Sequence, residues 1–519
     1  MTDRVYVYDT TLRDGAQMEG VSFSVADKLA VFHELVRFGV DFIETGMPAA
    51  NPKDEEFNRV VSETHPKVAV AFGSTRRINA KAAEDPGLKI LAESGDTVCI
   101  FGKSWDYHVR DALGTTLEEN LEMVSDSVAY LVSQGKSVVF DAEHFFDGWK
   151  ANPGYALSVL KAAADAGASW LVLCDTNGGS MPSEVRKATE DVLAHCPGVP
   201  VGIHSHNDSE LGVACSLAAV ESGATMVQGT INGIGERCGN ANLCSIIPAL
   251  VLKMGKSLPN VNMSMLTGVS RFVSESANIR HQAHMPYVGD KAFAHKGGMH
   301  ISAVLKAPDT YEHVAPDRVG NRRRLLVSDM AGRATIMEKM RGMGLDPDME
   351  TVTEVTNRVK EMEAAGYQFE GADASFRLIV DRMTPGYERP FEIAGFRLHM
   401  DEASSSGIKS EASIKVRDRS GNEEHTASDG NGPVNALDNA LRKALTKFYP
   451  QLADVRLTDY KVRVLDEKAA TAAAVRVLIT STDGKGIWTT VGVSDNVIEA
   501  SLIALSDSIE YALAPRSGE

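Results

Sequence analysis

The sequence predicts an α/β protein that consists of a TIM-type (β/α)8 barrel, a helical connecting subdomain and a C-terminal α+β domain. Three observations lead to this prediction. Short β-branched runs alternate with amphipathic stretches through residues 5–254. Eight strand–helix pairs in that length match the size of a closed barrel. Polar residues gather directly after the strand ends, which meet at one mouth in a barrel. In an open doubly wound sheet, the alternative with the same alternation, they would spread along an edge.

The composition limits the classes of function. Of 519 residues, 43% are hydrophobic and 24% are charged, as in ordinary globular proteins. The formal net charge of −17 disfavours non-specific binding to nucleic acid or to an anionic membrane surface, because both need a cationic face. There is no apolar run of membrane-spanning length, no signal-peptide pattern and no CxxC pair. We therefore expect a cytoplasmic protein with neither a nucleic-acid nor a membrane partner.

The barrel elements follow from hydrophobic periodicity and from capping residues. Ser24 and Asp27 form a capping-box pattern, and Pro153 and Pro182 suit the first turn of a helix. The predicted strands are Val5–Thr10, Val40–Thr45, Val68–Phe72, Thr97–Phe101, Ser137–Asp141, Trp170–Asp175, Val201–His206 and Thr225–Ile231. The predicted helices are Val25–Phe38, Lys53–Thr64, Asn79–Glu93, Leu117–Ser133, Pro153–Ala166, Pro182–His195, Ser209–Ser222 and Leu243–Met254.

The rest of the chain divides into two parts that differ in their pattern of predicted helices and strands. We assign residues 1–265 to the catalytic barrel, 266–370 to the connecting subdomain and 371–519 to a regulatory domain. The connecting part has helix candidates at Ala334–Met343 and Thr351–Ala365. The last part mixes strands and helices without strict alternation, which is typical of α+β domains. Its predicted strands are Phe376–Val380, Phe391–His399, Ser413–Arg417, Tyr460–Val464, Val475–Ser481 and Thr489–Ser494, and its predicted helices are Val434–Phe448 and Val497–Leu513.

The pair His204 and His206 is the clearest chemical motif. Residues i and i+2 of a strand share a face, so both imidazoles should project into the barrel mouth. Two imidazoles and a carboxylate suit a divalent metal, and hydrogen-bonded core histidines are the alternative. Asp14 follows the end of strand 1 and Asn240 lies in the loop after strand 8, so in a closed barrel both come from strand ends adjacent to that of the histidines. This mixed nitrogen and oxygen set does not choose between Mg²⁺, Mn²⁺ and Zn²⁺.

Four further residues follow strand ends. Arg13 suits a substrate carboxylate or a developing oxyanion; a salt bridge to Asp14 or Glu44 is the alternative. Neighbouring side chains on a strand end should point apart, which favours the catalytic interpretation of Arg13. Glu143 is a candidate acid or base, with a capping or pairing role equally open. Glu44 and Thr176 are candidates for substrate binding.

The loop at Gly430, Asn431 and Gly432 is a candidate effector site. Glycines allow a close approach of the backbone to a small ligand, and the helix that follows offers its N-terminus to a carboxylate. An amino acid bound there would act on the barrel allosterically.

Several of these segments resemble a known family. Thr10–Gln17, His204–Asp208 and Gly235–Asn242 resemble the DRE-TIM metallolyase superfamily, and within it the branch of 2-isopropylmalate, citramalate and homocitrate synthases. Asp429–Val434 and Thr490–Leu502 resemble the LeuA-type allosteric dimer domain of that branch. The segments Ala49–Asp54, Ile231–Ile247 and Phe293–His300 look most like the citramalate synthases.

The resemblance implies an acyltransferase that condenses acetyl-CoA with pyruvate to (R)-citramalate in isoleucine biosynthesis. It implies a divalent metal at Asp14, His204, His206 and Asn240, keto-acid contacts from Arg13 and Thr176, and an acid/base role for Glu143.

It also implies that the partner subunit of a homodimer lends His300 to the site, with Tyr311 at a similar offset, and that isoleucine is the effector. Whether Glu143 or His300 is the base stays open. The alternatives are a 2-isopropylmalate synthase that uses 2-ketoisovalerate, a metal-dependent lyase, and an amino-acid-sensing regulator without catalysis.

Overall fold

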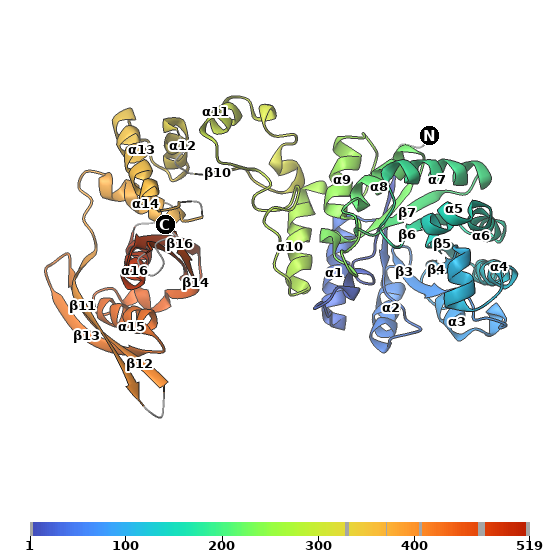
Figure 1. The fold of residues 1–519 in the computed structure, drawn as a ribbon, viewed down its shortest axis with the longest axis horizontal. Coiled ribbons are helices and arrows are strands. Elements are labelled where there is room, and N and C mark those ends of the chain that lie inside the picture. Colours follow the sequence, from blue (N-terminus) through green and yellow to red (C-terminus); the bar gives the residue numbers. More distant parts are fainter. Residues whose placement is uncertain (1–3, 327–331, 370, 404–406, 466–472, 515–519) are drawn as a thin grey trace. The chain divides into compact units, whose positions relative to one another are not determined.

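The chain packs as two compact units. The structure, a computed structural model, describes residues 4–326, 332–369, 371–403, 407–465 and 473–514. The first unit comprises Met1–Phe293 with Val314–Arg322, and the second comprises Ala294–His313 with Arg323–Glu519. Figure 1 draws the first unit mainly in blue and green and the second in yellow to red. The boundaries at residues 265 and 370 stay predictions.

The first unit is a closed barrel of parallel strands. Consecutive strands pair with one another, and β1 pairs with β8, with Tyr6 opposite Met226, so no sheet edge is left. This closure excludes the open doubly wound sheet and confirms the predicted fold class. The strands are β1 Tyr6–Asp9, β2 Phe42–Glu44, β3 Ala69–Ser74, β4 Thr97–Lys103, β5 Ser137–Glu143, β6 Trp170–Asp175, β7 Val201–Ser205 and β8 Met226–Gly229.

Helices surround the barrel (Figure 1). They are α1 Val25–Phe38, α2 Pro52–Thr64, α3 Pro86–Ala92, α4 Leu117–Ser133, α5 Phe145–Ala151, α6 Pro153–Asp165, α7 Pro182–His195, α8 Gly212–Glu221, α9 Leu243–Leu252 and α10 Leu266–Ser276. The Ser24 capping box opens α1, as predicted. The predicted helix Asn79–Glu93 is wrong in extent: the Asp85 side chain caps a new helix at Pro86, so only a 3-10 turn at Ala82–Glu84 precedes α3.

The barrel interior is filled below its mouth. Side chains that face inward from alternate strand positions form one core, made of Tyr8, Val70, Phe72, Cys99, Val139, Val172, Cys174 and Met226. A second, larger core lies between the strands and the surrounding helices. Because the interior is packed, it is not a channel, and a ligand site is expected at the carboxyl ends of the strands.

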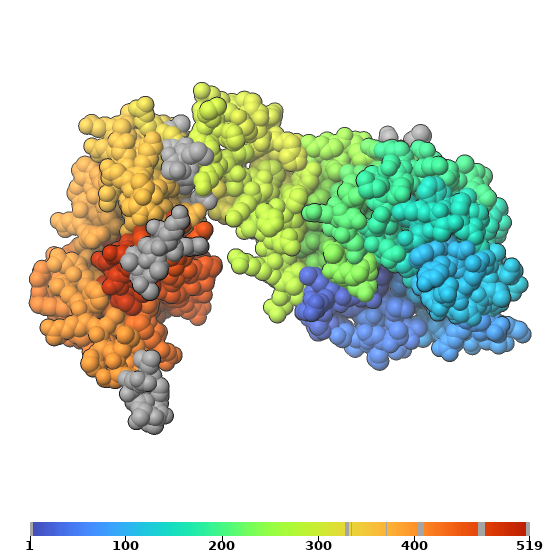
Figure 2. Space-filling view, in the orientation of Figure 1, coloured from blue at the N-terminus to red at the C-terminus, as the bar shows by residue number. Residues whose placement is uncertain are grey.

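The second unit contains two antiparallel sheets, each covered by one long helix. Its helices are α11 Gly298–Lys306, α12 Arg333–Gly342, α13 Met349–Ala364, α14 Asp373–Met383, α15 Pro433–Leu445 and α16 Val497–Leu513. Its strands are β9 Ala294–His295, β10 Arg324–Leu325, β11 Phe391–Ala403, β12 Gly407–Asp418, β13 Glu423–Gly430, β14 Arg456–Val464, β15 Val475–Thr482 and β16 Ile487–Ser494. In Figure 2 the residues of α12 and α13 (yellow) and of α15 (orange) lie on either side of the residues of β16 and α16 (red).

One predicted strand of this unit is a helix. The run Phe376–Val380 lies inside α14. Phe376, Ile379 and Val380 are three and four residues apart, which is helical spacing, and all three are buried in one cluster with Val491 of β16. Among the described residues, no helix combines the length and the apolar character that crossing a bilayer requires.

Candidate active site

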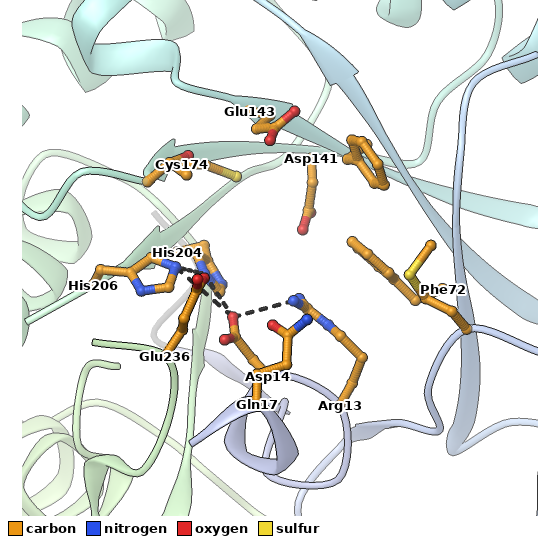
Figure 3. A pocket seen from close by; sticks show the side chains of 13 residues that line it. Arg13, Asp14, Gln17, Phe72, Asp141, Glu143, Cys174, His204, His206 and Glu236 are labelled. Carbon is orange, nitrogen blue, oxygen red and sulfur yellow. Dashed lines mark hydrogen bonds and ion pairs between the residues drawn. The ribbon is translucent and has the colours of Figure 1, made fainter. Parts of the chain in front are cut away.

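A pocket lined by both charged and apolar side chains opens at the carboxyl ends of the barrel strands. Its volume is about 760 Å³, including the open space at its entrance. Figure 3 shows side chains that converge on it from opposite sides of the barrel. The lining residues are Arg13, Asp14, Gln17, Met47, Phe72, Phe101, Asp141, Glu143, Cys174, Thr176, His204, His206 and Glu236.

Asp14, His204 and His206 form a compact cluster of possible metal ligands. Oδ2 of Asp14 lies 3.5 Å from Nε2 of His204 and 3.8 Å from Nε2 of His206. The two Nε2 atoms are 3.3 Å apart. Ligand atoms about 2.1 Å from one ion are separated by about 3 to 3.6 Å, so this spacing suits a single cation. All three side chains are buried.

Two residues of this cluster, and the nearby Asn240, carry buried polar atoms without a hydrogen-bond partner among the described residues. Oδ1 of Asp14, Nδ1 of His206 and both side-chain polar atoms of Asn240 are buried and lack a hydrogen-bond partner within the described part of the chain. A β-bridge joins the backbone of Asn240 to that of His206. Buried polar groups are normally satisfied, and a divalent ion beside the three convergent ligands would satisfy the two orphan acceptors, Oδ1 of Asp14 and Oδ1 of Asn240. Asn240 does not line the pocket itself.

The electrostatics of the cluster favour a cation. Burial would raise the pKa of Asp14, but the Arg13 guanidinium and the two imidazoles outweigh it and hold that pKa well below its usual range. Burial and the neighbouring His204 lower the pKa of His206 to about 4, which leaves its imidazole neutral. Burial works against a proton on His204, yet the hydrogen bond and charge of Asp14 raise its pKa.

Arg13 lines the pocket, and two ion pairs hold its guanidinium in place. Its Nε donates to Oε2 of Glu44 at 2.5 Å, and its NH1 lies 3.1 Å from Oδ2 of Asp14. Its guanidinium also stacks on Phe72, 4.1 Å from the ring centroid. The expectation that Arg13 and Asp14 point apart is therefore wrong. Both follow the end of β1, in a turn with helical backbone angles at Asp14, where neighbouring side chains diverge less than on a strand.

Glu44 does not line the pocket. It is fully buried and accepts hydrogen bonds from Arg13 and from the Tyr8 hydroxyl, the latter at 2.8 Å. Burial raises the pKa of Glu44, while Arg13 opposes that effect. The structure therefore places Glu44 behind Arg13, as a support for the guanidinium.

Glu143 ends β5 and faces the pocket (Figure 3). The Lys103 ammonium, at the matching position of β4, donates to its Oε2. Thr176 lies after β6, where its hydroxyl oxygen accepts from the backbone N–H of His144 at 2.9 Å. That leaves the Thr176 O–H free to donate toward a ligand.

His300 and Tyr311 lie in the second unit. Their rings pack together, with centroids 4.3 Å apart and planes inclined by 31°. Both side chains are exposed, and so they are accessible to a partner molecule. Their predicted roles stay predictions.

The candidate effector loop joins β13 to α15. Gly430 ends the strand, and a Cβ there would lie 2.2 Å from the backbone nitrogen of Ala436. Gly430 thus allows the strand to approach α15 itself. The N–H of Asn431 donates to Oδ1 of Asn435 at 3.1 Å, and Gly432 is the N-cap of α15. Effector binding at this loop stays a prediction.

Two inward-facing polar residues of the barrel escaped the sequence analysis. Gln228 of β8 and Asp141 of β5 are both buried and hydrogen-bonded to each other. Asp141 lies in β5, before the strand-end residue Glu143, and Gln228 lies in β8. A polar residue at an inward position of an otherwise apolar strand, such as Asp141 two residues before Glu143, was the available signal.

Three family models together match most of the chain. The family model described as HMGL-like matches residues 4–273, the homocitrate synthase post-HMGL domain-like model matches residues 287–366, and the LeuA allosteric (dimerisation) domain model matches residues 370–513.

Several relatives align with nearly the whole of this chain, and each is named as a synthase. The (R)-citramalate synthase of Aquifex aeolicus is 53% identical, with 99% of this chain and 98% of the relative aligned. The (R)-citramalate synthase of Geobacter sulfurreducens is 52% identical over 98% of this chain and 97% of the relative. A probable 2-isopropylmalate synthase of Methanopyrus kandleri is 35% identical, with 97% of each chain aligned.

Proposed function

This chain belongs to the HMGL-like family, and we propose that it condenses acetyl-CoA with pyruvate to give (R)-citramalate and free CoA. One observation of the structure carries the proposal: the cluster Asp14, His204 and His206 opens into the same pocket as Arg13 and Glu143. A Claisen condensation needs these three functions together, namely an electrophilic centre, an anion-binding group and a base.

The cluster of Asp14, His204 and His206, with Asn240 beside it, would hold a divalent cation. When bound, this cation supplies polarisation of the keto group of pyruvate. Mg²⁺ or Mn²⁺ suits a site with carboxylate and amide oxygens, and Zn²⁺ is also compatible with two imidazoles.

Arg13 and Thr176 would hold the keto acid. Two N–H groups of the Arg13 guanidinium are engaged by Asp14 and Glu44, and the remaining N–H groups can bind the pyruvate carboxylate or the alkoxide that forms from the keto oxygen. The ion pair with Glu44 and the stacking on Phe72 fix the orientation of the guanidinium before substrate arrives. Thr176 can donate its O–H to the same carboxylate.

Glu143 would take a proton from the methyl group of the acetyl thioester. The enolate then attacks the keto carbon, and hydrolysis of the thioester with one water releases CoA. The ion pair with the neighbouring Lys103 ammonium holds the Glu143 carboxylate at the edge of the pocket. His300 from a partner subunit is the alternative base, with Tyr311 beside it.

The C-terminal domain suits a regulated biosynthetic enzyme. We assign it the binding of isoleucine and the formation of a homodimer, because a LeuA allosteric (dimerisation) domain model matches residues 370–513. Feedback inhibition belongs to a committed biosynthetic step, which favours synthesis over the reverse lyase reaction. A cytoplasmic location is consistent with substrates of central metabolism.

The test is the release of free thiol from acetyl-CoA with a panel of 2-keto acids. We expect pyruvate to exceed 2-ketobutyrate and 2-ketoisovalerate in kcat/KM, with a discrimination of about 10–200-fold per methylene. The product with pyruvate should coelute with (R)-citramalate on a chiral column. A preference for 2-ketoisovalerate would instead identify a 2-isopropylmalate synthase, and no thiol release with any keto acid would contradict the synthase function.

A further inference from the structure

A hydrogen-bonded chain crosses the barrel floor behind the metal-ligand cluster. Nδ1 of His204 lies 2.9 Å from Oε1 of Gln228. Nε2 of Gln228 donates to Oδ1 of Asp141 at 3.0 Å. The strand register sets the first link, because Gln228 of β8 lies directly beside His204 of β7. The second link spans the barrel interior from β8 to β5, so only a closed barrel can make it.

Each hydrogen bond in the row Asp141–Gln228–His204 has a defined donor and a defined acceptor. The Gln228 amide turns its NH2 toward the Asp141 carboxyl oxygen, which accepts, and its carbonyl toward His204. A carbonyl oxygen also only accepts, so the proton on the neutral His204 ring must sit on Nδ1. Nε2 of His204 is then left with a lone pair, and it faces Asp14 and His206.

We propose that Asp141, acting through Gln228, sets the tautomer and orientation of His204 and thereby preorganises the cation site. Both are positioning residues: neither is placed on the cation, and Asp141, which also lines the pocket, is linked to His204 through two hydrogen bonds. The proposal rests on the proposed function only in taking the cluster of Asp14, His204 and His206 as a cation site. It gives a role to Asp141 and Gln228, which are not themselves proposed ligands of the cation.

The local environment supports this role over plain packing. Gln228 is fully buried in the barrel interior among apolar side chains such as Met226 and Val139. An amide there costs free energy unless both ends are bonded, and an apolar residue of similar size would fill the space without that cost. By contrast, Nδ1 of His206 has no partner among the described residues, so only one of the two imidazoles is fixed in this way.

The test measures Mn²⁺ affinity, without turnover, in the full-length protein stripped of metal. Free Mn²⁺ is read by electron paramagnetic resonance during a titration at pH 7.5. In D141N the new amide can donate to Gln228, which then turns its own NH2 toward His204 and favours the proton on Nε2. We expect the Kd for Mn²⁺ to rise about 10–100-fold, as is usual when a group behind a metal ligand is lost.

D175N is the matched control. Asp175 is also a buried carboxylate at the end of a barrel strand, but its side chain bonds to Ser180 and to no ligand. Its Kd should stay within about 3-fold of the wild type, since nothing behind a ligand changes. Circular dichroism and thermal unfolding establish that each variant is folded.

The double variant D141N/Q228E separates tautomer control from structural damage. It exchanges carboxylate and amide, so the acceptor still faces His204 and the donor now comes from position 141. We expect Mn²⁺ affinity to return to within about 3-fold of the wild type, because the direction of the chain is restored. General damage to the core would be worsened, not repaired, by a second substitution.

The following results of these Mn²⁺ titrations would overturn the proposal or the cation site. A D141N protein that binds Mn²⁺ as tightly as the wild type, or a double variant no better than D141N, overturns the proposal. If D141N does not fold, Q228M takes its place, and an unchanged Kd in Q228M overturns the proposal equally. A wild-type protein without Mn²⁺ affinity contradicts the cation site and this proposal together. A failed keto-acid assay with intact Mn²⁺ binding contradicts the proposed reaction alone.

Discussion

The Nε2 atoms of His204 and His206 lie 3.3 Å apart, and both face Oδ2 of Asp14. Two imidazole lone pairs at this distance repel each other unless a proton or a cation lies between them. The nearby carboxylate, whose pKa is held well below its usual range, favours that positive charge. This relationship between two side chains at the end of β7 supports the cation site that we propose at the barrel mouth.

Removal of the metal should abolish activity. Exhaustive chelation is expected to reduce thiol release to background, and added Mg²⁺ or Mn²⁺ should restore it, because Asp14, His204 and His206 have no other means of polarising a keto group. H204A and H206A should each lose most activity while remaining folded. Full turnover with metal content near zero by elemental analysis would contradict the metal role.

The Arg13 guanidinium should be irreplaceable by an amine. R13K keeps the charge but cannot bind Glu44 and Asp14 in fixed geometry while donating into the pocket, so kcat/KM for pyruvate should fall by about 10²–10³-fold. Steady-state kinetics with pyruvate as the varied substrate measures this loss. R186K, in an exposed pair with Glu221, is the control and should be unchanged. Equal kinetics for R13K and the wild type would reject the role of Arg13.

Loss of the Glu143 carboxylate should reduce kcat more than it affects KM. E143Q removes a base but preserves shape, so we expect kcat to fall by about 10²–10⁴-fold. The same variant should also fail to exchange the methyl protons of acetyl-CoA with D2O in the presence of pyruvate. E184Q is the control, because Glu184 also pairs with a lysine, Lys150, but caps α7 away from the pocket. A kcat near that of the wild type in E143Q would transfer the base role to His300.

Asp9 should make stability depend on pH. Burial raises the pKa of this carboxyl to about 7, although Thr11 donates two hydrogen bonds to it. Its folded-state pKa lies above that of an unfolded chain. The stability from its protonated form is therefore complete below about pH 4 and is lost as pH rises through about 7.

D9N cannot titrate, so it should gain stability relative to the wild type as pH rises. The gain between about pH 4 and 8 should reach at most roughly 4 kcal/mol, at about 1.4 kcal/mol per pKa unit. Urea unfolding of both proteins across this range measures the difference. Parallel pH profiles for the two proteins would show that Asp9 does not titrate in this way.

Isoleucine should inhibit the enzyme through the loop between β13 and α15, and leucine should be much weaker. N431A is expected to raise the isoleucine concentration for half-inhibition at least about 10-fold, the loss of roughly one good hydrogen bond to a charged group, with basal activity unchanged. N422A, at the opposite end of β13, is the control and should respond like the wild type. Unaltered isoleucine sensitivity in N431A would place the effector elsewhere.

Local sequence patterns were sufficient for the barrel and for its most polar motif. Apolar runs at the period of a strand, capping residues such as Ser24, and the spacing of His204 and His206 all depend on neighbours along the chain. The same local reasoning failed at Phe376–Val380. A short apolar run fits either period there, and its burial against Val491 decided the helix.

The sequence by itself determined the strand order, the barrel class and which residue types reach its mouth. Only the tertiary structure decided who their partners are: Glu44 behind Arg13, Lys103 beside Glu143, and Gln228 between His204 and Asp141. Each of these contacts joins residues on different strands, so it depends on the register of the strands and on closure of the barrel. No pattern of neighbours along the chain contains that information, because register is set by the packing of the whole barrel.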